Sequence, residues 1–175
     1  MKKSFFVTLA LLLAAVIVQA QTSPSSVPTD PQIAMIAVTA DNVDIEAAKL
    51  AATKTSNPKV KDFANLMVRD HTSVNKKATN LAKKLKITPE ESDTSRSLKS
   101  DGNTTLEKLR GLSGTEFDKA YIDNEVTYHE AVIKTVDDTL IPNAKNSELK
   151  ALLQSGKPIF VSHLNHAKEL QASLK

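Results

Sequence analysis

Three of the four histidines stand where a helix would be expected to present an aliphatic side chain. His71, His129 and His163 each fall on a different predicted helix, at a position of its apolar stripe. A buried polar group without a partner costs about 1–3 kcal/mol, so each imidazole is expected to have one. Each residue of a helix adds about 1.5 Å along its axis. Counted from the predicted turns, the three histidines and Glu46 therefore lie at similar heights along the helix bundle.

This convergence predicts a site for one transition-metal ion formed by Glu46, His71, His129 and His163. Neutral imidazoles suit borderline cations such as Zn, Mn or Fe, and a carboxylate offsets the charge of the ion. Glu125 lies four residues before His129 on the same helix face, where it could add a ligand or accept a hydrogen bond. Two further residues, His166 and Glu169, either extend the site or face solvent.

A second interpretation needs no metal. Buried histidines often tie helices together through a carboxylate or a carbonyl group, and Asp70, Glu46 or Tyr121 could serve as the partner. For three histidines at one height the two interpretations are evenly balanced. The other acidic residues of the first helix, Asp41 and Asp44, are expected on its solvated face.

Other kinds of chemistry find little support in the sequence. The chain has no cysteine, no Gly-x-Ser-x-Gly motif and no glycine-rich phosphate loop. Its net charge is only +3, with both signs interspersed, so no nucleic-acid partner is expected. We therefore expect a role other than catalysis, although an open position on a metal could support redox chemistry.

Four segments with helical periodicity must position these residues. Their apolar residues recur every three or four positions over 33–50, 60–85, 117–140 and 149–174. Short turns near 56–58 and 142–146 join the first two and the last two, whereas a connection over 87–115, with a short helix at 105–112, links the pairs. Pro158 is expected to kink or restart the last helix. This pattern predicts an all-α fold without strands, a ferritin-like four-helix bundle of two antiparallel hairpins with a long connection between helices two and three.

The N-terminal residues have the features of a secretory signal peptide. Lys2 and Lys3 precede an apolar run of about 14 residues, shorter than the roughly 20 of a membrane-spanning helix, and small residues end it at Ala20. We expect a signal peptide at 1–20, a disordered tether at 21–30 and one helical domain at 31–174, with order beginning near Asp30. Without a cysteine, the mature chain can carry neither a lipid anchor nor a disulfide.

Several motifs in this order resemble the ferritin-like family catalogued as domain of unknown function 4142. They cover nearly the whole predicted domain and are Glu46-Ala-Ala-Lys-Leu-Ala51, Asn57-Pro-Lys-Val-Lys-Asp-Phe-Ala64, Met67-Val-Arg-Asp-His71, Phe117-Asp-Lys-Ala-Tyr121, His129, Pro158 and His163-Leu-Asn-His-Ala167. The resemblance implies an exported four-helix protein, periplasmic or peripheral at the outer membrane, with a core metal site at Glu46, His71, His129 and His163. It implies no established activity.

The sequence departs from the two-iron pattern of ferritin-like proteins, which place a Glu three residues before a ligand His. Val68, Val126 and Phe160 occupy those positions here. A mononuclear site is therefore expected, in an exported protein with a storage, sensing or stress-protective role. The alternative is a metal-free envelope protein that acts through protein or surface interaction. No membrane span is expected after signal cleavage; the protein partner is unknown, and oligomerisation and secretion beyond the periplasm remain open.

Overall fold

The computed structural model describes residues 27–174, which are helical throughout apart from the connecting loops and contain no strand. The predicted signal peptide and residues 21–26 of the predicted tether lie outside this range. The elements in chain order are α1 (Asp30–Lys54), α2 (Pro58–Leu85), α3 (Asp93–Gly111), α4 (Gly114–Thr135), a π-helical turn η1 (Val136–Leu140), α5 (Ile141–Asn143) and α6 (Ser147–Ser173). The all-α prediction is confirmed for these residues.

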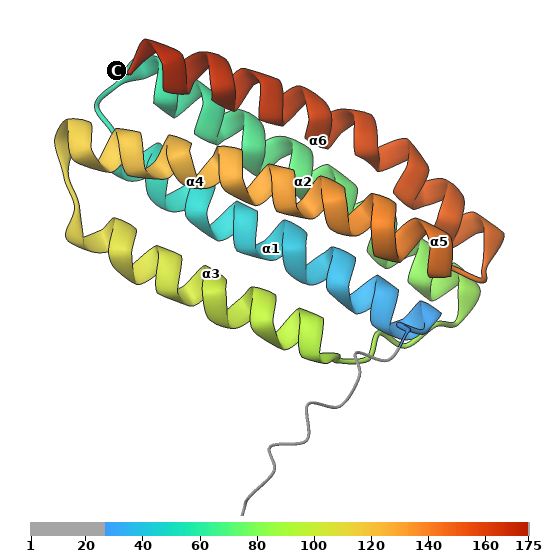
Figure 1. Ribbon diagram of the computed structural model, residues 1–175. Coiled ribbons are helices and arrows are strands. Elements are labelled where there is room, and N and C mark those ends of the chain that lie inside the picture. The colour runs from blue at the N-terminus through green and yellow to red at the C-terminus, as the bar shows by residue number, and fades with distance from the viewer. Residues whose placement is uncertain (1–26, 175) are drawn as a thin grey trace, which may run out of the picture.

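Four long helices lie side by side, and a fifth covers one of them from outside (Figure 1). Helix α1 packs against α2, α4 packs against α6, and α2 also contacts α6. Helix α3 packs mainly against α1. The functional residues described below come from α1, α2, α4 and α6, whereas α3 shields α1.

Local capping fixes where the helices begin. Thr29 and Gln32 form a capping box at the start of α1, with Pro31 in the first turn. The side chain of Asn57 accepts a hydrogen bond from the first turn of α2, and Asn146 does the same for α6. These caps hold the register of the helices, and the register decides which residues face the core.

The core consists of two apolar clusters separated along the helices by a polar layer. One cluster gathers around Phe63, Met67, Phe117 and Tyr121, and the other around Ile33 and its neighbours. On α1, α4 and α6 the residues between the clusters include buried Asp and His side chains instead of aliphatic ones. The apolar clusters on both sides keep this layer away from water.

Two details differ from the sequence-based expectation. The connection between α2 and α4 holds the 19-residue helix α3, whereas a helix only at 105–112 was predicted. Its sequence is mostly polar, with only Leu98, Leu106 and Leu109 as aliphatic residues, so the apolar pattern is sparse. The start of the helix is set by the Ser92 cap and the hydroxyl group of Ser95. The helix α6 also continues through Pro158, so it does not restart there. Apolar residues on both sides of Pro158 are buried, which offsets the loss of one backbone hydrogen bond.

No helix within residues 27–174 is long and apolar enough to cross a membrane.

The contact between α1 and α3 depends on one glycine. Gly102 lies buried in the middle of α3, and a Cβ atom placed on it would come within 2.7 Å of Cγ1 of Val43. Valine is stiff at χ1 in a helix, so this methyl group cannot easily turn away. Glycine in a helix interior normally reduces stability by about 1 kcal/mol relative to alanine, and the close approach of the two helices explains its presence here.

We expect Gly102→Ala to lower the free energy of unfolding by about 1–3 kcal/mol, because the added methyl group overpacks the contact. Urea denaturation measures the change. Gly111→Ala is the matched control, since a Cβ there meets nothing within 4 Å, and it should leave stability unchanged or slightly higher. Adding Val43→Ala to Gly102→Ala should restore much of the loss. Equal stability of the two single variants would show that the contact is not tight.

Candidate metal centre

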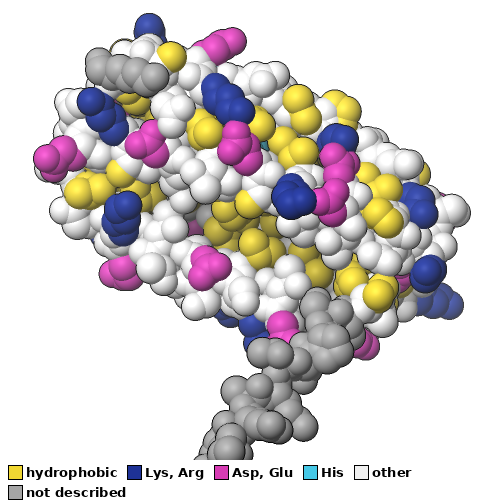
Figure 2. All heavy atoms as spheres, viewed as in Figure 1, with side chains coloured by type: hydrophobic (Ala, Val, Ile, Leu, Met, Phe, Trp, Pro, Cys, Tyr) yellow, Lys and Arg dark blue, Asp and Glu magenta, His cyan; other side chains and the backbone are white. Residues whose placement is uncertain are grey.

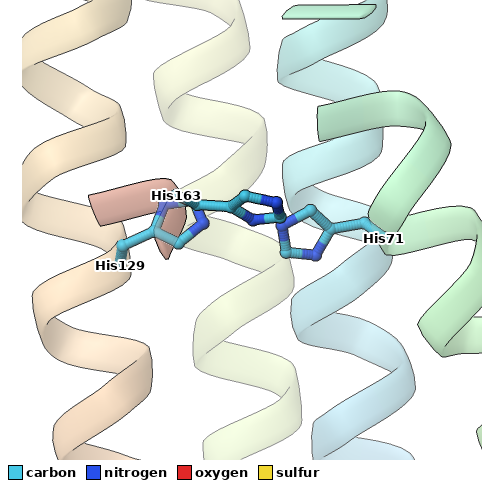
Figure 3. Close-up of side chains that lie close together, drawn as sticks. All are labelled: His71, His129 and His163. Atoms are coloured by element: carbon cyan, nitrogen blue, oxygen red, sulfur yellow. The ribbon is translucent and has the colours of Figure 1, made fainter. Parts of the chain in front are cut away.

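Three imidazoles from three different helices converge in the polar layer (Figure 3). His71 of α2, His129 of α4 and His163 of α6 have ring centroids 5.2–5.5 Å apart. All three side chains are buried, with at most 3% of each residue exposed. One nitrogen of each ring lies within 4.8 Å of the corresponding nitrogen of the other two. The structure thus brings together the three histidines that the sequence singled out.

Each ring has one nitrogen fixed by an oxygen acceptor outside the triangle. Nδ1 of His71 lies 2.8 Å from Oδ1 of Asp41, and Nε2 of His163 lies 3.1 Å from Oδ2 of Asp70. Nδ1 of His129 donates to the backbone carbonyl of Glu125 at 3.0 Å. An oxygen acceptor on one nitrogen leaves the lone pair on the other nitrogen of a neutral ring, and metal-binding histidines are usually oriented in this way.

The second nitrogen of each ring is buried and has no hydrogen-bond partner. These atoms are Nε2 of His71, Nε2 of His129 and Nδ1 of His163. Of the nine buried side-chain atoms without a partner in the described residues, seven belong to Asp44, Glu125 and the three histidines, and the other two are on Tyr121 and Asn75. Buried polar atoms are nearly always paired in proteins, so such a concentration indicates a site that binds something polar.

Asp44 of α1 supplies a carboxylate to the triangle. Its Oδ2 lies 3.4 Å from Nε2 of His71 and 3.6 Å from Nε2 of His129, and neither carboxylate oxygen accepts a hydrogen bond. Two ligand atoms bound at about 2.0–2.1 Å to a tetrahedral ion lie about 3.3–3.4 Å apart. The separations between Asp44 and the two rings are therefore those of ligands that share an ion.

Glu46, the carboxylate predicted from the sequence, does not join the three histidines. Its side chain is 57% exposed and pairs with Lys49 on the surface of α1. The two carboxylates expected on the solvated face are in fact buried, since Asp41 is 3% exposed and Asp44 is 1% exposed. The expectation that Asp41 and Asp44 are solvated was wrong, and Asp44, not Glu46, lies beside His71 and His129.

The error has a simple geometric cause. The apolar stripe predicted over 33–50 passed through Ala40 and Val43, which are only half-buried. At the height of the histidines the buried positions are instead the next residues along, Asp41 and Asp44. Both stripes satisfy a spacing of three and four residues. In a helix rich in alanine the apolar pattern hardly distinguishes the two.

Burial raises the pKa of the carboxyl groups in this layer. The pKa of Asp44 rises from 3.8 to about 6 because desolvation outweighs the attraction of His71. Burial likewise raises the pKa of Asp41 despite its hydrogen bond to His71. Burial, reinforced by the charge of Asp44, raises the pKa of Glu125 well above its usual range. A bound cation would favour the ionised forms of all three groups.

The pKa values of the three imidazoles shift in different directions. Burial would lower the pKa of His71, but the carboxylates of Asp44 and Asp41 outweigh it and raise the pKa. Burial and the neighbouring His71 lower the pKa of His129 to about 3, so this ring is neutral at physiological pH. Burial is also the main cause of the lowered pKa of His163. The lowered pKa values of His129 and His163 favour neutral rings with a free lone pair, and the raised pKa of His71 means that a metal ion bound there would compete with a proton.

Glu125 extends the site on the α4 side. It is fully buried, both its carboxyl oxygens lack a partner, and Oε2 lies 3.6 Å from Nδ1 of His129. Together with Asp44 and His129 it forms a second group of closely spaced ligand atoms. Tyr121, one turn earlier, also has a buried hydroxyl group without a partner. Glu125 thus lies beside Asp44 and His129, as its spacing to His129 predicted, and its role as an additional ligand stays a prediction.

His166 and Glu169 lie apart from this layer. The ring of His166 packs edge-on against Phe63, with centroids 5.1 Å apart, and Glu169 is exposed.

Comparison with known proteins identifies a family. A family model described as "Domain of unknown function (DUF4142)" matches residues 16–170. No curated protein matches the chain, and no solved structure does. The chemistry of the site must therefore be argued from its own geometry.

We expect Asp44→Asn to stabilise the metal-free protein by about 1–3 kcal/mol at pH 8. The pKa of Asp44 is higher in the folded state, about 6, than the ordinary 3.8, so the buried carboxylate lowers stability as the pH rises through this window and the full penalty remains above it. At pH 5 the gain should fall to roughly half.

Urea denaturation in the presence of a chelator, at both pH values, measures this gain. Glu46→Gln is the control, because that exposed carboxylate should change stability by less than about 0.5 kcal/mol. A destabilised Asp44→Asn protein at pH 8 would mean that the carboxylate is paired in the folded state.

Proposed function

The chain belongs to the DUF4142 family, whose description names no activity, and we propose from the site itself that the protein binds one transition-metal ion. The ligands are Nε2 of His71, Nε2 of His129, Nδ1 of His163 and a carboxylate oxygen of Asp44. Three imidazoles and one carboxylate suit Zn, Mn or Fe. Glu125 is available as a fifth ligand.

One observation carries this proposal: the three inward nitrogens and both oxygens of Asp44 are buried without a partner, while the outward nitrogens are all fixed. Histidines with a purely structural role would be expected to pair on both sides or to leave the free side in water. Here the inward atoms face only each other. A cation bound between these atoms would satisfy the inward nitrogens and the carboxylate of Asp44 together.

We further propose that the four helices around the site form a ferritin-like bundle of two hairpins, α1 with α2 and α4 with α6. The order of the apolar clusters supports this topology. Along α1 and α6 the cluster of Ile33 and Leu149 comes before the histidine layer, whereas along α4 the cluster of Phe117 comes first. Neighbouring helices therefore run in opposite directions, as hairpins with short loops require.

The proposed biological role is metal storage, sensing or protection against metal or oxidative stress outside the cytoplasm. The signal-peptide features of residues 1–20 support export to the periplasm, to the outer-membrane surface or beyond. Four protein ligands fill a tetrahedral shell, which favours holding an ion over catalysis.

The untagged mature protein is expected to bind close to one equivalent of Zn, Mn or Fe. His129→Ala should lose this metal, because it removes a ligand from the centre of the layer. Elemental analysis after equilibration with each metal and removal of the excess gives the stoichiometry.

The control for this loss is His166→Ala. It removes the same kind of side chain, half-buried and one turn beyond His163, and should keep the metal. Glu46→Gln should also keep it, whereas Asp44→Ala should not. A wild-type protein that stays metal-free, with a melting temperature unaffected by the three metals, would contradict the proposal.

Asp41→Asn should weaken metal affinity about 10–100-fold without changing the maximum stoichiometry, because Asp41 orients His71 but does not bind the ion. Competition with a chromogenic chelator measures the affinity. Asp62→Asn, an exposed acid on α2, is the control and should behave as wild type. An unchanged affinity in Asp41→Asn would show that His71 is not a ligand or needs no orientation.

A further inference from the structure

The proposed metal centre is closed to solvent. Its candidate ligands, Asp44, His71, Glu125, His129 and His163, are each at most 3% exposed. An ion can therefore reach the centre only when a side chain moves aside. Such a route should begin at a polar group that touches both solvent and one of the ligands, because a charged group is costly to remove from water without new partners.

A hollow between α1, α3 and α4 lies close to the centre but does not provide this route. Figure 2 shows it as a patch of hydrophobic side chains in the middle of the face covered by α3 and α4. Most of its lining is aliphatic or small, among them Ile36, Leu98 and Val132. Where the hollow borders Asp44, both carboxylate oxygens of that residue are buried. A hydrated cation would exchange water for apolar walls here, which is unfavourable.

One of the groups that fix the imidazoles does reach solvent. The side chain of Asp41 is only 4% exposed and the carbonyl of Glu125 belongs to a buried residue, but the side chain of Asp70 on α2 is 26% exposed. Oδ1 of Asp70 accepts a hydrogen bond from Nε of Arg69 at 2.8 Å, and Oδ2 lies 3.1 Å from Nε2 of His163. The Arg69 side chain is 71% exposed, so this ion pair is weak and water can replace it.

His163 connects Asp70 to the centre. Its Nε2 meets Asp70, while its Nδ1 is one of the inward nitrogens without a partner. The other two rings are held more firmly. His71 binds a buried carboxylate and stacks on Phe160 with centroids 5.4 Å apart, and His129 binds a backbone carbonyl of its own helix. Of the three imidazoles, His163 therefore loses least when it turns aside.

We propose that Asp70 and His163 form an entry site at which a divalent transition-metal cation first binds on its way to the centre. The inference rests on the proposed metal function and adds a route to it. The cation binds the carboxylate of Asp70 in competition with the guanidinium group of Arg69. The His163 side chain then turns aside, and its Nδ1 closes over the ion as a ligand. No proton has to leave this ring, because Nε2 keeps its own.

Asp70→Asn tests the capture step. Asparagine keeps an oxygen that can accept from Nε2 of His163, but it has no charge to attract a cation. We expect the association rate of Co²⁺ to fall about ten-fold, while release of Co²⁺ into excess chelator changes less than about three-fold. The visible absorption of bound Co²⁺ in a stopped-flow instrument measures both rates. A variant that loads at the wild-type rate, or that only releases the ion faster, would overturn the inference.

Arg69 allows a test in the opposite direction. Arg69→Gln removes the cation that competes for Asp70 and should raise the association rate of Co²⁺ about three-fold. Arg69→Lys keeps the charge and should load as wild type. Because Arg69 is exposed, this pair of variants still decides the question if Asp70→Asn fails to fold. Unchanged or slower loading of Arg69→Gln would contradict competition at Asp70.

Three further exchanges of Asp for Asn locate the entry. Asp62→Asn, at an exposed position about 12 Å from Asp70 along α2, controls for net charge and should load as wild type. So should Asp101→Asn, at the exposed acid that lines the hollow. Asp41→Asn should weaken binding through faster release, because Asp41 orients His71 from a buried position. Slower loading of Asp101→Asn than of Asp70→Asn would place the entry in the hollow and overturn the inference.

The outcomes separate the two proposals. A wild-type protein that binds no Co²⁺ at equilibrium contradicts the proposed metal function, and the entry site with it. A protein that binds Co²⁺ with the same rates in wild type, Asp70→Asn and Arg69→Gln keeps the metal function and overturns the entry site alone. Equal slowing of Asp62→Asn and Asp70→Asn would reduce the effect to net charge and also overturn the entry site.

Discussion

The burial of Asp44 constrains the rest of this structure. A carboxylate in the core without a hydrogen bond is strongly unfavourable unless a cation accompanies it or a proton neutralises it. The pKa of about 6 places Asp44 between these two states. The neighbouring groups are perturbed as well. The pKa values of His129 and His163 are lowered, the pKa of His71 is raised, and burial raises the pKa of Glu125. The metal-free layer is therefore costly, which supports the proposal that it holds a cation.

The fold can hold such a layer because the apolar clusters on either side of it do not depend on it. The packing of Phe63, Phe117 and Tyr121 on one side, and of Ile33 and Leu140 on the other, keeps the helices in register whatever the charge state of the layer. Three separate acceptors then fix the imidazoles, so the inward nitrogens are oriented before any ion arrives. Preorganisation of this kind is what allows a metal to bind without refolding the chain.

Much of this could be predicted from the sequence, and the failures have identifiable causes. The long helices followed from apolar spacing and from caps such as Asn57, and the three histidines were recognisable because they interrupt that spacing. Asp44 was missed because alanines on α1 make two adjacent stripes equally plausible. Helix α3 was mostly missed because its sequence is largely polar and its three leucines are widely spaced. Its place against α1, where Gly102 allows a close approach to Val43, is decided by tertiary packing. In both cases the local sequence pattern was compatible with more than one structure, and the packing of the helices determined which one forms.

The surroundings of Asp44 also limit what can neutralise it. Both carboxylate oxygens are fully buried, and Oδ2 lies 3.4 Å from Nε2 of His71 and 3.6 Å from Nε2 of His129. A proton or a single cation fits between these atoms, whereas a larger ligand would have to move the helices apart. Binding of the proposed ion is therefore coupled to the proton on Asp44, because ligands of a metal must be deprotonated.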